Sequence, residues 1–507
     1  MRRWKLVSPG AIFLAAAGTG LLTRPAVTQS RPDIPRTWKA EDVATFELPL
    51  ASARHSPVHV PEDYYYQLPV RPVYRSYPIY RPDREPAGYQ QWLRDQEPEV
   101  VFDEASLVTD QQWIDAGALV FEAPFAYNRP LIGVRHVRDR AWYADLQVPV
   151  RSDGVMPFAR WVIRERGRPE VGNLACSMCH TRVMPEGTAL AGAQGNFPFD
   201  RSFARDLATT PMPLPAARTV MYQLLAAPWA NEESIREMSR ADLIAAVNAI
   251  PPGVLLRQGT SLAHPAKVPD LIGIRDRKYL DATGLVRHRD IGDLMRYAAA
   301  NQAIDMLARY GDFIPAGRAD GTRPDAGQSS MVGTADRHSD AQLYALSRYL
   351  YSLDPPANPN PVTDLTRRGE AVFREQQCGR CHTPPLYTNN RIMPAPGFKP
   401  TEDHLRQYDV MDVALGTDPG LALTTRRGTG YYKVPSLKGV WYRGVFEHRG
   451  SVAALEDWFD PARVRNDYIP TGFKGAGARP RPVPGHLFGL SLSDEEKRAL
   501  VAFLRTL

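Results

Sequence analysis

The four cysteines of this 507-residue chain fall in two copies of one pattern, Cys176-Ser-Met-Cys179-His180 and Cys378-Gly-Arg-Cys381-His382. The two thiols of a C-x-x-C pair lie about one helical turn apart, so each can form a thioether to one vinyl group of a porphyrin. The histidine that follows then reaches the iron as an axial ligand. The pattern therefore predicts two covalently attached c-type haems, with His180 and His382 as iron ligands.

Other uses of paired cysteines fit the pattern less well. A four-cysteine zinc site would have to join pairs that lie 202 residues apart, from Cys176 to Cys378, which is far beyond the spacing of a zinc ribbon. A thioredoxin-like redox pair or a disulfide needs no histidine after the second cysteine, and neither explains why the motif occurs twice. Four cysteines are also too few for a disulfide-stapled scaffold in a chain of this length.

Residues 1–28 are typical of a secretory signal peptide. Basic residues precede an apolar stretch at 11–22, which is short for a membrane-spanning helix of about 20 residues. We expect cleavage near residues 26–29 and export to the periplasm, which agrees with the attachment of haem c outside the cytoplasm. The alternative is an uncleaved segment that anchors the chain in the membrane, and only in that case do we expect a membrane partner.

The charge of the chain does not indicate a nucleic-acid partner. Lys and Arg number 62 against 56 Asp and Glu, which gives a formal net charge of +6. The predicted signal peptide carries four basic residues and no acid, so the mature chain has a charge of only +2. The composition, 43% hydrophobic and 23% charged, is that of a globular protein and excludes collagen-like, disordered and polytopic membrane chains.

Residues 29–104 are rich in proline and tyrosine, as in the stretch PVRPVYRSYPIYRP at 69–82. Prolines at this density exclude long helices and central strands. We expect an extended arm on the surface, with its tyrosines packed against the rest of the protein.

From residue 105 onward, three segments recur in the same order. Gly117 to Phe121 resembles Gly369 to Phe373, each before a haem motif. KVPDLIG at 267–273 resembles KVPSLKG at 433–439, with an arginine ten residues after each lysine, and we call these two copies the KVP elements. SDAQLYALSRYLYSL at 339–353 resembles SDEEKRALVAFLRTL at 493–507, and both segments begin with a capping box. This internal repeat indicates a duplicated domain.

The order of helix, haem motif, loops and closing helix fits a class I cytochrome c domain. We expect a mainly α fold with two such haem domains and long loops: residues 105–353 for haem 1 and 363–507 for haem 2. The proline-rich stretch 354–362 between them is a linker that no helix can cross. Phe373 lies five residues before Cys378, whereas Phe121 lies 55 before Cys176, so the first domain carries an insertion of about 50 residues.

The sixth ligand of each iron decides whether a haem only transfers electrons or also reacts with substrate. For haem 2 the preferred ligand is His486, in the turn Pro-Gly-His486-Leu-Phe-Gly before the closing helix. The other candidates are His448, His404, Met393 and Met411.

For haem 1, the alignment of the closing helices places Val332, which cannot bind iron, at the position of His486. The site is then either open and reactive, which is our expectation, or closed by a replacement ligand. The candidate replacements are Met331, His338, His288 and Met295.

The chain resembles the bacterial di-haem cytochrome c peroxidase superfamily, which includes the methylamine dehydrogenase maturation enzyme and the rubber oxygenases. The resemblance covers about residues 105–507, and its most specific segment is KVPSLKGVWYRGVFEHRGSVAALEDWFD at 433–460. It implies one haem that reacts with substrate and one that stores or relays an electron, with His486 as the distal ligand of haem 2. Trp441 and Trp161 are possible electron relays, although a packed core role is the simpler interpretation for each. The calcium site and the acid–base residue of that family match no motif here, so a calcium ion cannot be assigned and the catalytic residues are unknown.

These observations predict an exported di-haem oxidoreductase in which haem 1 reacts with peroxide, dioxygen or an organic substrate and haem 2 relays electrons. A redox partner protein or a small electron donor would supply those electrons. The first alternative is a non-catalytic di-haem electron-transfer cytochrome. A second alternative is an assembly role in the periplasm, with the tyrosine-rich arm as the binding element.

Overall fold

The computed structural model describes residues 32–128, 132–230, 232–257, 259–315 and 336–507. The chain divides into two units, Met1–Asp33 and Ile34–Leu507, and all elements named below belong to the second. The predicted signal peptide, Met331 and Val332 lie outside the described residues. Within the described ranges, no helix has both the length and the apolar character that crossing a membrane requires.

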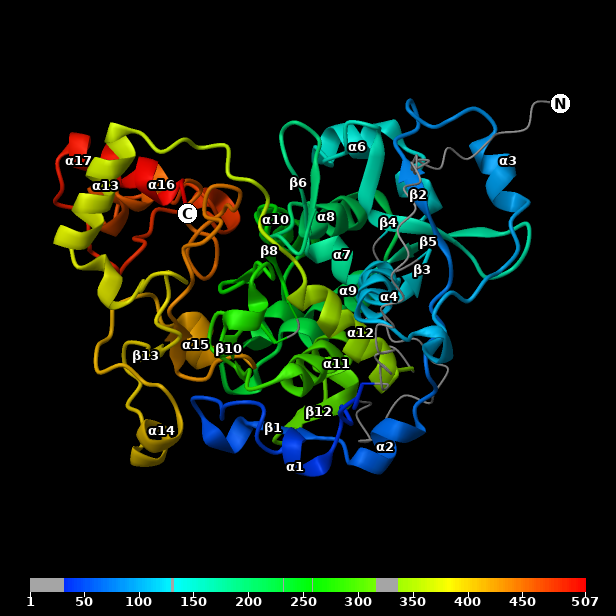
Figure 1. Cartoon of the computed structure of the whole chain (residues 1–507), viewed down its shortest axis with the longest axis horizontal. Coiled ribbons are helices and arrows are strands. Elements are labelled where there is room, and N and C mark those ends of the chain that lie inside the picture. Colours follow the sequence, from blue (N-terminus) through cyan, green and yellow to red (C-terminus); the bar gives the residue numbers. More distant parts are fainter. Residues whose placement is uncertain (1–31, 129–131, 231, 258, 316–335) are drawn as a thin grey trace, which may run out of the picture. The chain divides into compact units, whose positions relative to one another are not determined.

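Two pairs of crossing helices carry the internal repeat. In the first pair, α4 (Asp110–Glu122) packs on α12 (Asp340–Tyr351), and in the second, α13 (Asp364–Glu375) packs on α17 (Asp494–Leu504), as Figure 1 shows for α13 and α17. Both crossings occur at a glycine. A Cβ added at Gly117 would lie 2.0 Å from the carbonyl oxygen of Ala345, and one added at Gly369 would lie 1.9 Å from that of Ala499. Because Ala345 and Ala499 are equivalent in the repeat, the two pairs cross in the same way.

The two predicted capping boxes are confirmed. The hydroxyl of Ser339 accepts a hydrogen bond from the backbone N–H of Gln342, and Ser493 accepts one from Glu496. The side chains of Gln342 and Glu496 accept in return from the backbone N–H of the two serines. These bonds satisfy amide groups that would otherwise lack partners at the start of α12 and α17.

The structure adds a pair of short antiparallel strands to the repeat. In the first copy β8 (Val254–Leu255) pairs with β9 (Ala266–Lys267), and in the second β13 (Ile392–Pro394) pairs with β14 (Tyr431–Lys433). The second strand of each pair ends at the lysine of a KVP element, opposite Val254 in one copy and Ile392 in the other. Each strand pair therefore leads directly into the valine and proline of its KVP element.

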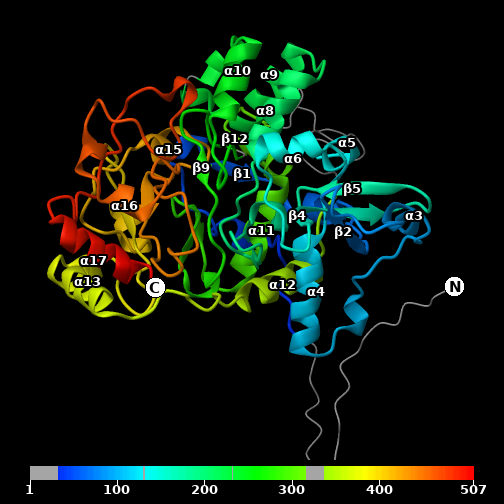
Figure 2. The same ribbon diagram turned by 90° about the horizontal axis from the view of Figure 1, so that it is seen from above.

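The segment between α4 and the first haem motif forms most of a small antiparallel sheet with the strand order β2-β4-β5-β3. Its strands are β2 (Ser76–Tyr80), β3 (Ala126–Tyr127), β4 (Val155–Ile163) and β5 (Pro169–Asn173), and the segment also contains α5 (Val134–Val137) and α6 (Arg140–Leu146). Met178, inside the first haem motif, is fully buried against the core of this region. Figure 2 shows the sheet at the opposite end of the second unit from α13 and α17. The described part of the predicted insertion thus packs on Met178 of the first haem motif.

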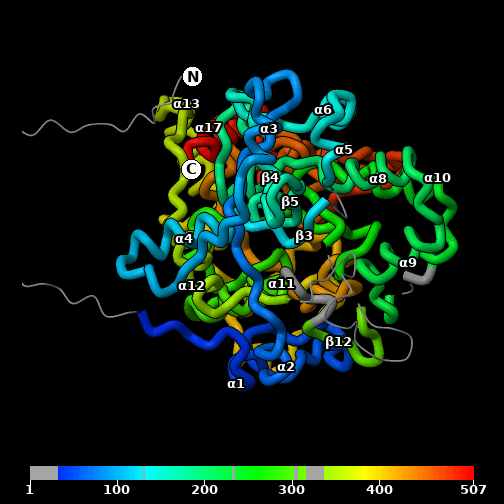
Figure 3. The backbone as a smooth tube through the Cα atoms, turned by 90° about the vertical axis from the view of Figure 1, so that its right-hand side faces the viewer, coloured from blue at the N-terminus to red at the C-terminus, as the bar shows by residue number. Residues whose placement is uncertain are grey.

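In its described part, the proline-rich segment before α4 contains only short elements, among them α1 (Ala40–Val43), α2 (Glu62–Gln67), α3 (Tyr89–Arg94) and β1 (Pro57–His59), besides β2. Strand β1 pairs with β12 (Ala308–Tyr310), and Figure 3 shows α1 and α2 beside β12. Trp38, Phe46 and Tyr65 from this segment are buried in the largest hydrophobic core. The segment therefore supplies core residues to the first domain in addition to lying along it.

Residues 352–363, between α12 and α13, contain no helix or strand. Asn358 and Asn360 donate hydrogen bonds to the carbonyl oxygen of Arg505, at the end of α17. The remaining α-helices of the described residues are α8 (Phe199–Thr209), α9 (Leu214–Leu225), α10 (Arg240–Asn248), α11 (Ile291–Leu307), α14 (Glu402–Gln407), α15 (Gly420–Thr424) and α16 (Leu455–Trp458), with α7 described below.

Candidate functional site: two haem-attachment motifs

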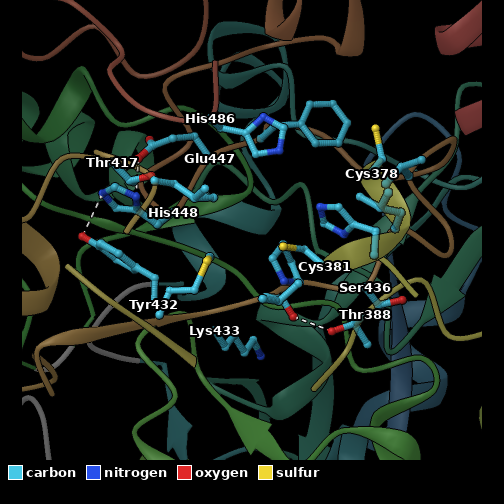
Figure 4. Close-up of a pocket in the computed structure, with 18 of the residues that line it drawn as sticks. Cys378, Cys381, Thr388, Thr417, Tyr432, Lys433, Ser436, Glu447, His448 and His486 are labelled. Carbon is cyan, nitrogen blue, oxygen red and sulfur yellow. Dashed lines mark hydrogen bonds and ion pairs between the residues drawn. The ribbon is translucent and has the colours of Figure 1, made fainter. Parts of the chain in front are cut away.

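The second haem motif lies on the wall of a large cavity. Cys378 begins the short 3-10 helix η6 (Cys378–Arg380) directly after α13, and the backbone N–H of His382 donates to the carbonyl of Cys378 at 2.9 Å. The cavity has a volume of about 570 Å³ and is lined by Cys378, Cys381, His382 and residues from both domains. Both cysteines carry free thiols, and Figure 4 shows them on the cavity wall. The site therefore offers two thiols and an imidazole to one enclosed space.

His486 faces His382 across this cavity. The centres of the two imidazole rings are 6.3 Å apart and the ring planes are inclined by 58°. Imidazole nitrogens bind transition metals at about 2.0–2.1 Å, and a ring centre lies about 1.1 Å beyond its nitrogen, so a metal held between two imidazoles separates their centres by about 6.3 Å. The spacing of His382 and His486 thus fits an iron ligated from both sides.

The environment of both rings favours the neutral imidazole that binds metals. Burial lowers the pKa of His486 to about 3, and the neighbouring His382 and Arg463 add to the effect. Burial also lowers the pKa of His382. Nδ1 of His382 donates to the carbonyl oxygen of Tyr387 at 3.2 Å, which leaves Nε2 as the available ligand atom.

The turn that carries His486 is fixed by its backbone conformation. Gly485 and His486 both have positive φ angles, +79° and +48°. A Cβ at Gly485 would also lie 2.5 Å from the backbone nitrogen of Thr417. Only glycine fits there, and the left-handed conformation of His486 itself is unusual for a residue with a Cβ.

Two residues that the sequence did not single out hold His486 in place. The indole N–H of Trp458 donates to Nδ1 of His486 at 3.1 Å. Arg463 is fully buried, and its guanidinium donates to the carbonyl oxygens of Trp458, Val483, Gly485 and His486 at 2.6–2.9 Å. Three of these carbonyls belong to residues 483–486, so the arginine fixes the backbone of the turn that carries His486.

The other four candidate ligands of haem 2 occupy different positions. His448 lines the cavity but stacks on Tyr432, with 4.5 Å between ring centres, and forms an ion pair with Glu447 (Figure 4). Nδ1 of His404 lies 2.9 Å from the hydroxyl of Tyr431. Met393 and Met411 line the cavity in one apolar cluster with Cys381. Of the five candidates, only His486 makes a ring contact with His382.

The first haem motif is held by the first KVP element. The short helix α7 (Cys176–Cys179) presents the motif, and Nδ1 of His180 donates to the carbonyl oxygen of Pro269 at 3.1 Å. At the second motif, Nδ1 of His382 bonds instead to the carbonyl oxygen of Tyr387, and the backbone of the equivalent Pro435 only opposes the fall in the pKa of His382. A backbone carbonyl therefore orients the imidazole at both motifs, from the KVP element in the first and from Tyr387 in the second.

Burial also shifts the pKa values of the first motif. It raises the pKa of the Cys179 thiol to about 12 and lowers the pKa of His180 to about 4, the latter with a further contribution from Arg257. A Cβ at Gly195 would lie 2.2 Å from the carbonyl oxygen of Cys179. The chain therefore closes tightly around this motif, and glycine at 195 allows it.

Among the described residues, the candidates for a sixth ligand at haem 1 make their contacts with residues other than His180. Nδ1 of His288 lies 2.6 Å from the carbonyl oxygen of Arg277, and its Nε2 lies 2.6 Å from the hydroxyl of Tyr351. His338 is buried, with Nδ1 3.0 Å from the side chain of Gln342. Met295 is buried in the core of the first domain. Met331 lies outside the described residues.

The two tryptophans proposed as relays have different surroundings. Trp441, in the second KVP element, packs with Ile272 of the first, so it lies where the two copies meet. Trp161 is buried in β4, in the core that contains Met178. Among the described residues, no group of three or more His, Cys, Asp or Glu side chains could hold a metal ion, and calcium stays unassigned.

No protein-family model and no curated protein matches this chain. Among solved structures, the chain is similar to a MauG-like protein associated with microbial copper homeostasis, with 17% identity over 48% of this chain and 73% of that one, at a TM-score of 0.29. It is also similar to the hydrazine synthase of Kuenenia stuttgartiensis, with 16% identity over 60% of this chain and 92% of that one, at a TM-score of 0.29. At these identities and TM-scores, neither likeness assigns a family or an activity.

Proposed function

We propose that the chain is an exported, periplasmic di-haem c-type cytochrome that acts as an oxidoreductase. The observation that carries the proposal is the contrast in histidine ligands. His382 and His486 face each other at the spacing of a doubly ligated iron, whereas no described histidine makes such a ring contact with His180. Two strong ligands suit electron transfer, and an open position suits reaction with a small substrate.

In this proposal, different residues would attach and ligate each haem. Cys176 and Cys179 would hold haem 1, with His180 as its single protein ligand. Cys378 and Cys381 would hold haem 2 between His382 and His486. When bound, the haems would supply reactivity toward peroxide or dioxygen at the first site and electron storage at the second. The protein contributes the orientation of His180 through Pro269 and of His486 through Trp458 and Arg463.

The insertion supports placing substrate at haem 1. It packs on Met178 of the first motif, and no such segment separates α13 from the second motif. An organic substrate would enter on this side, and a redox partner protein or small donor would deliver electrons through haem 2.

Spectroscopy of the exported holoprotein tests this proposal. Mass spectrometry should find two attached haems and a chain that begins near residues 26–29. The oxidised protein should show one low-spin and one high-spin haem, and cyanide or azide should convert only the high-spin one. If both haems are low-spin and refuse these ligands in every redox state, the chain is instead an electron-transfer cytochrome.

A further inference from the structure

Four basic side chains line the cavity where the two KVP elements meet. Lys267 and Arg277 come from the first copy, and Lys433 and Arg443 come from the second. We call these four residues the basic cluster. Their side chains are partly buried and border the same space as Cys378, Cys381 and His486.

The two arginines of the basic cluster are held in equivalent ways. Arg277 donates to the backbone carbonyl of Asp270, and Arg443 donates to that of Ser436 at 2.9 Å. Asp270 and Ser436 occupy the same position in the two KVP elements. Carbonyl oxygens orient the guanidinium groups but bring no negative charge to them.

One carboxylate accompanies the four cations. Asp270 lies 3.8 Å from Nη2 of Arg277 and 4.0 Å from Nε of Arg443, and it accepts a hydrogen bond from the hydroxyl of Tyr442 at 3.2 Å. Four cations and one carboxylate leave three positive charges without a counter-ion when both lysines are protonated.

Two further acids that act on the lysines of the cluster have ion-pair partners of their own. Asp281 is buried and ion-paired with Arg427 and Arg257. Glu447 is paired with His448 and accepts from the backbone N–H of Arg449 at 3.1 Å. Neither carboxylate forms an ion pair with the basic cluster.

Burial disfavours the charged form of both lysines in the cluster. Burial lowers the pKa of Lys267 to about 8 and that of Lys433 to about 7, and the neighbouring arginines lower both further, while nearby carboxylates oppose part of each shift. Nε of Arg443 and Oδ1 of Asp270 are buried without hydrogen-bond partners. Buried cations are costly unless they are paired and hydrogen-bonded, so this site is complete only with negative charge added from the cavity.

We propose that the basic cluster binds a pair of carboxylates, the two propionates of the haem held at Cys378 and Cys381. The proposal rests on haem attachment at the second motif, which is part of the function proposed above. Thioethers fix one edge of the macrocycle, the propionates leave from the opposite edge, and one cavity joins the two cysteines to the cluster. Two propionates supply two of the missing negative charges and accept charge-assisted hydrogen bonds.

The test uses the holoprotein and four variants. Lys433→Gln and Lys267→Gln each remove one charge from the cluster, and Lys433→Arg keeps the charge. Lys438→Gln is the matched control, because Lys438 belongs to the same KVP element but is exposed and does not line the cavity. The readouts are the propionate-bending bands in resonance Raman spectra and the midpoint potential of each haem.

Both glutamine variants should shift the propionate bands. They should also lower the reduction equilibrium constant of haem 2 about tenfold, or about 59 mV for one electron, because a nearby cation stabilises the reduced haem. Lys433→Arg and Lys438→Gln should match the wild type. Should Lys433→Gln fail to fold, Lys267→Gln provides the same test.

Mass spectrometry separates failure of this proposal from failure of the proposed function. A wild-type chain with no haem at the second motif contradicts both. With two haems attached, unchanged Raman bands and potentials in the glutamine variants contradict the propionate assignment alone. Binding of free succinate to the wild-type holoprotein, lost in Lys433→Gln, would also overturn it, because the cluster would then serve a free dicarboxylate.

Discussion

The two haem motifs share their scaffold and differ in what faces them. In both, a helix that crosses its partner at a glycine precedes the motif, and a backbone carbonyl oxygen accepts from Nδ1 of the histidine, that of Pro269 for His180 and that of Tyr387 for His382. Across from His382 lies His486, whereas the equivalent position in the first domain is Val332, outside the described residues. By the alignment of the closing helices, the two copies thus share the helix crossing and differ in sequence at the position of His486.

Packing explains why both helix crossings have a glycine. Gly117 and Gly369 have no room for a side chain, because the carbonyl oxygens of Ala345 and Ala499 lie where a Cβ would be. His486 lies outside the second crossing, in the turn before α17, and that turn has its own close contact at Gly485. The helix crossing and the residue that faces His382 are therefore fixed by separate contacts.

The largest expected effect follows from removing His486. His486→Ala should convert haem 2 from low-spin to high-spin and open it to cyanide, which would make the two sites alike. His404→Ala is the control, because His404 bonds to Tyr431 and does not line the cavity. Optical and electron paramagnetic resonance spectra of the oxidised variants measure the change. An unchanged spectrum of His486→Ala would exclude His486 as ligand.

The sequence predicts those features of the two sites that depend on residues close together in the chain. The haem motifs, the capping boxes at Ser339 and Ser493, and the glycine before His486 are patterns within a few residues, and each is visible without a structure. The contacts of Trp458 and Arg463 with the turn at 483–486 join residues about 20 or more positions apart, so no local pattern reveals them. In the same way, proline density predicted the short elements of residues 34–104 but not the burial of Trp38 and Phe46.

The buried carboxyl of Asp200, near Cys179 of the first motif, should make the free energy of unfolding depend on pH. Asp200, in α8, is 4% exposed and accepts a hydrogen bond from the N–H of Leu256 at 3.2 Å. Burial raises its pKa to about 7. Between pH 4 and 7 the unfolded carboxyl loses a proton that the folded one keeps, so the free energy of unfolding falls as pH rises, by at most about 4 kcal/mol.

Asp200→Asn should remove this loss. The variant should be more stable than the wild type at pH 8 by up to about 4 kcal/mol, and the two should converge near pH 4. Denaturant unfolding at several pH values measures the difference, with the exposed Asp312→Asn as control. The same pH dependence in wild type and Asp200→Asn would mean that Asp200 is ionised in the folded protein.

The equivalence of the two helix crossings predicts equal costs for the same substitution. Gly117→Ala and Gly369→Ala each force a Cβ onto a backbone oxygen about 2 Å away, and overpacking of this kind costs about 3 kcal/mol. Gly379→Ala is the control, because nothing lies within 4 Å of its Cβ position. Thermal unfolding of the three variants measures the costs. Clearly unequal losses at positions 117 and 369 would show that the crossings are not energetically equivalent.

The smallest effect should come from Trp458, which holds His486 by one hydrogen bond. Trp458→Phe keeps an aromatic ring but removes the N–H donor. The loss of this hydrogen bond costs about 1 kcal/mol, which lowers the equilibrium preference of His486 for its bound position about fivefold. An added ligand such as azide competes with His486, so its apparent affinity for haem 2 should rise by the same factor while its affinity for haem 1 stays constant. Azide titrations of the wild type, Trp458→Phe and the control Trp441→Phe measure this.

Two outcomes would contradict this prediction. A fully high-spin haem 2 in Trp458→Phe would mean that the indole does more than orient His486. An unchanged azide affinity would mean that Arg463 and the turn hold His486 without the indole.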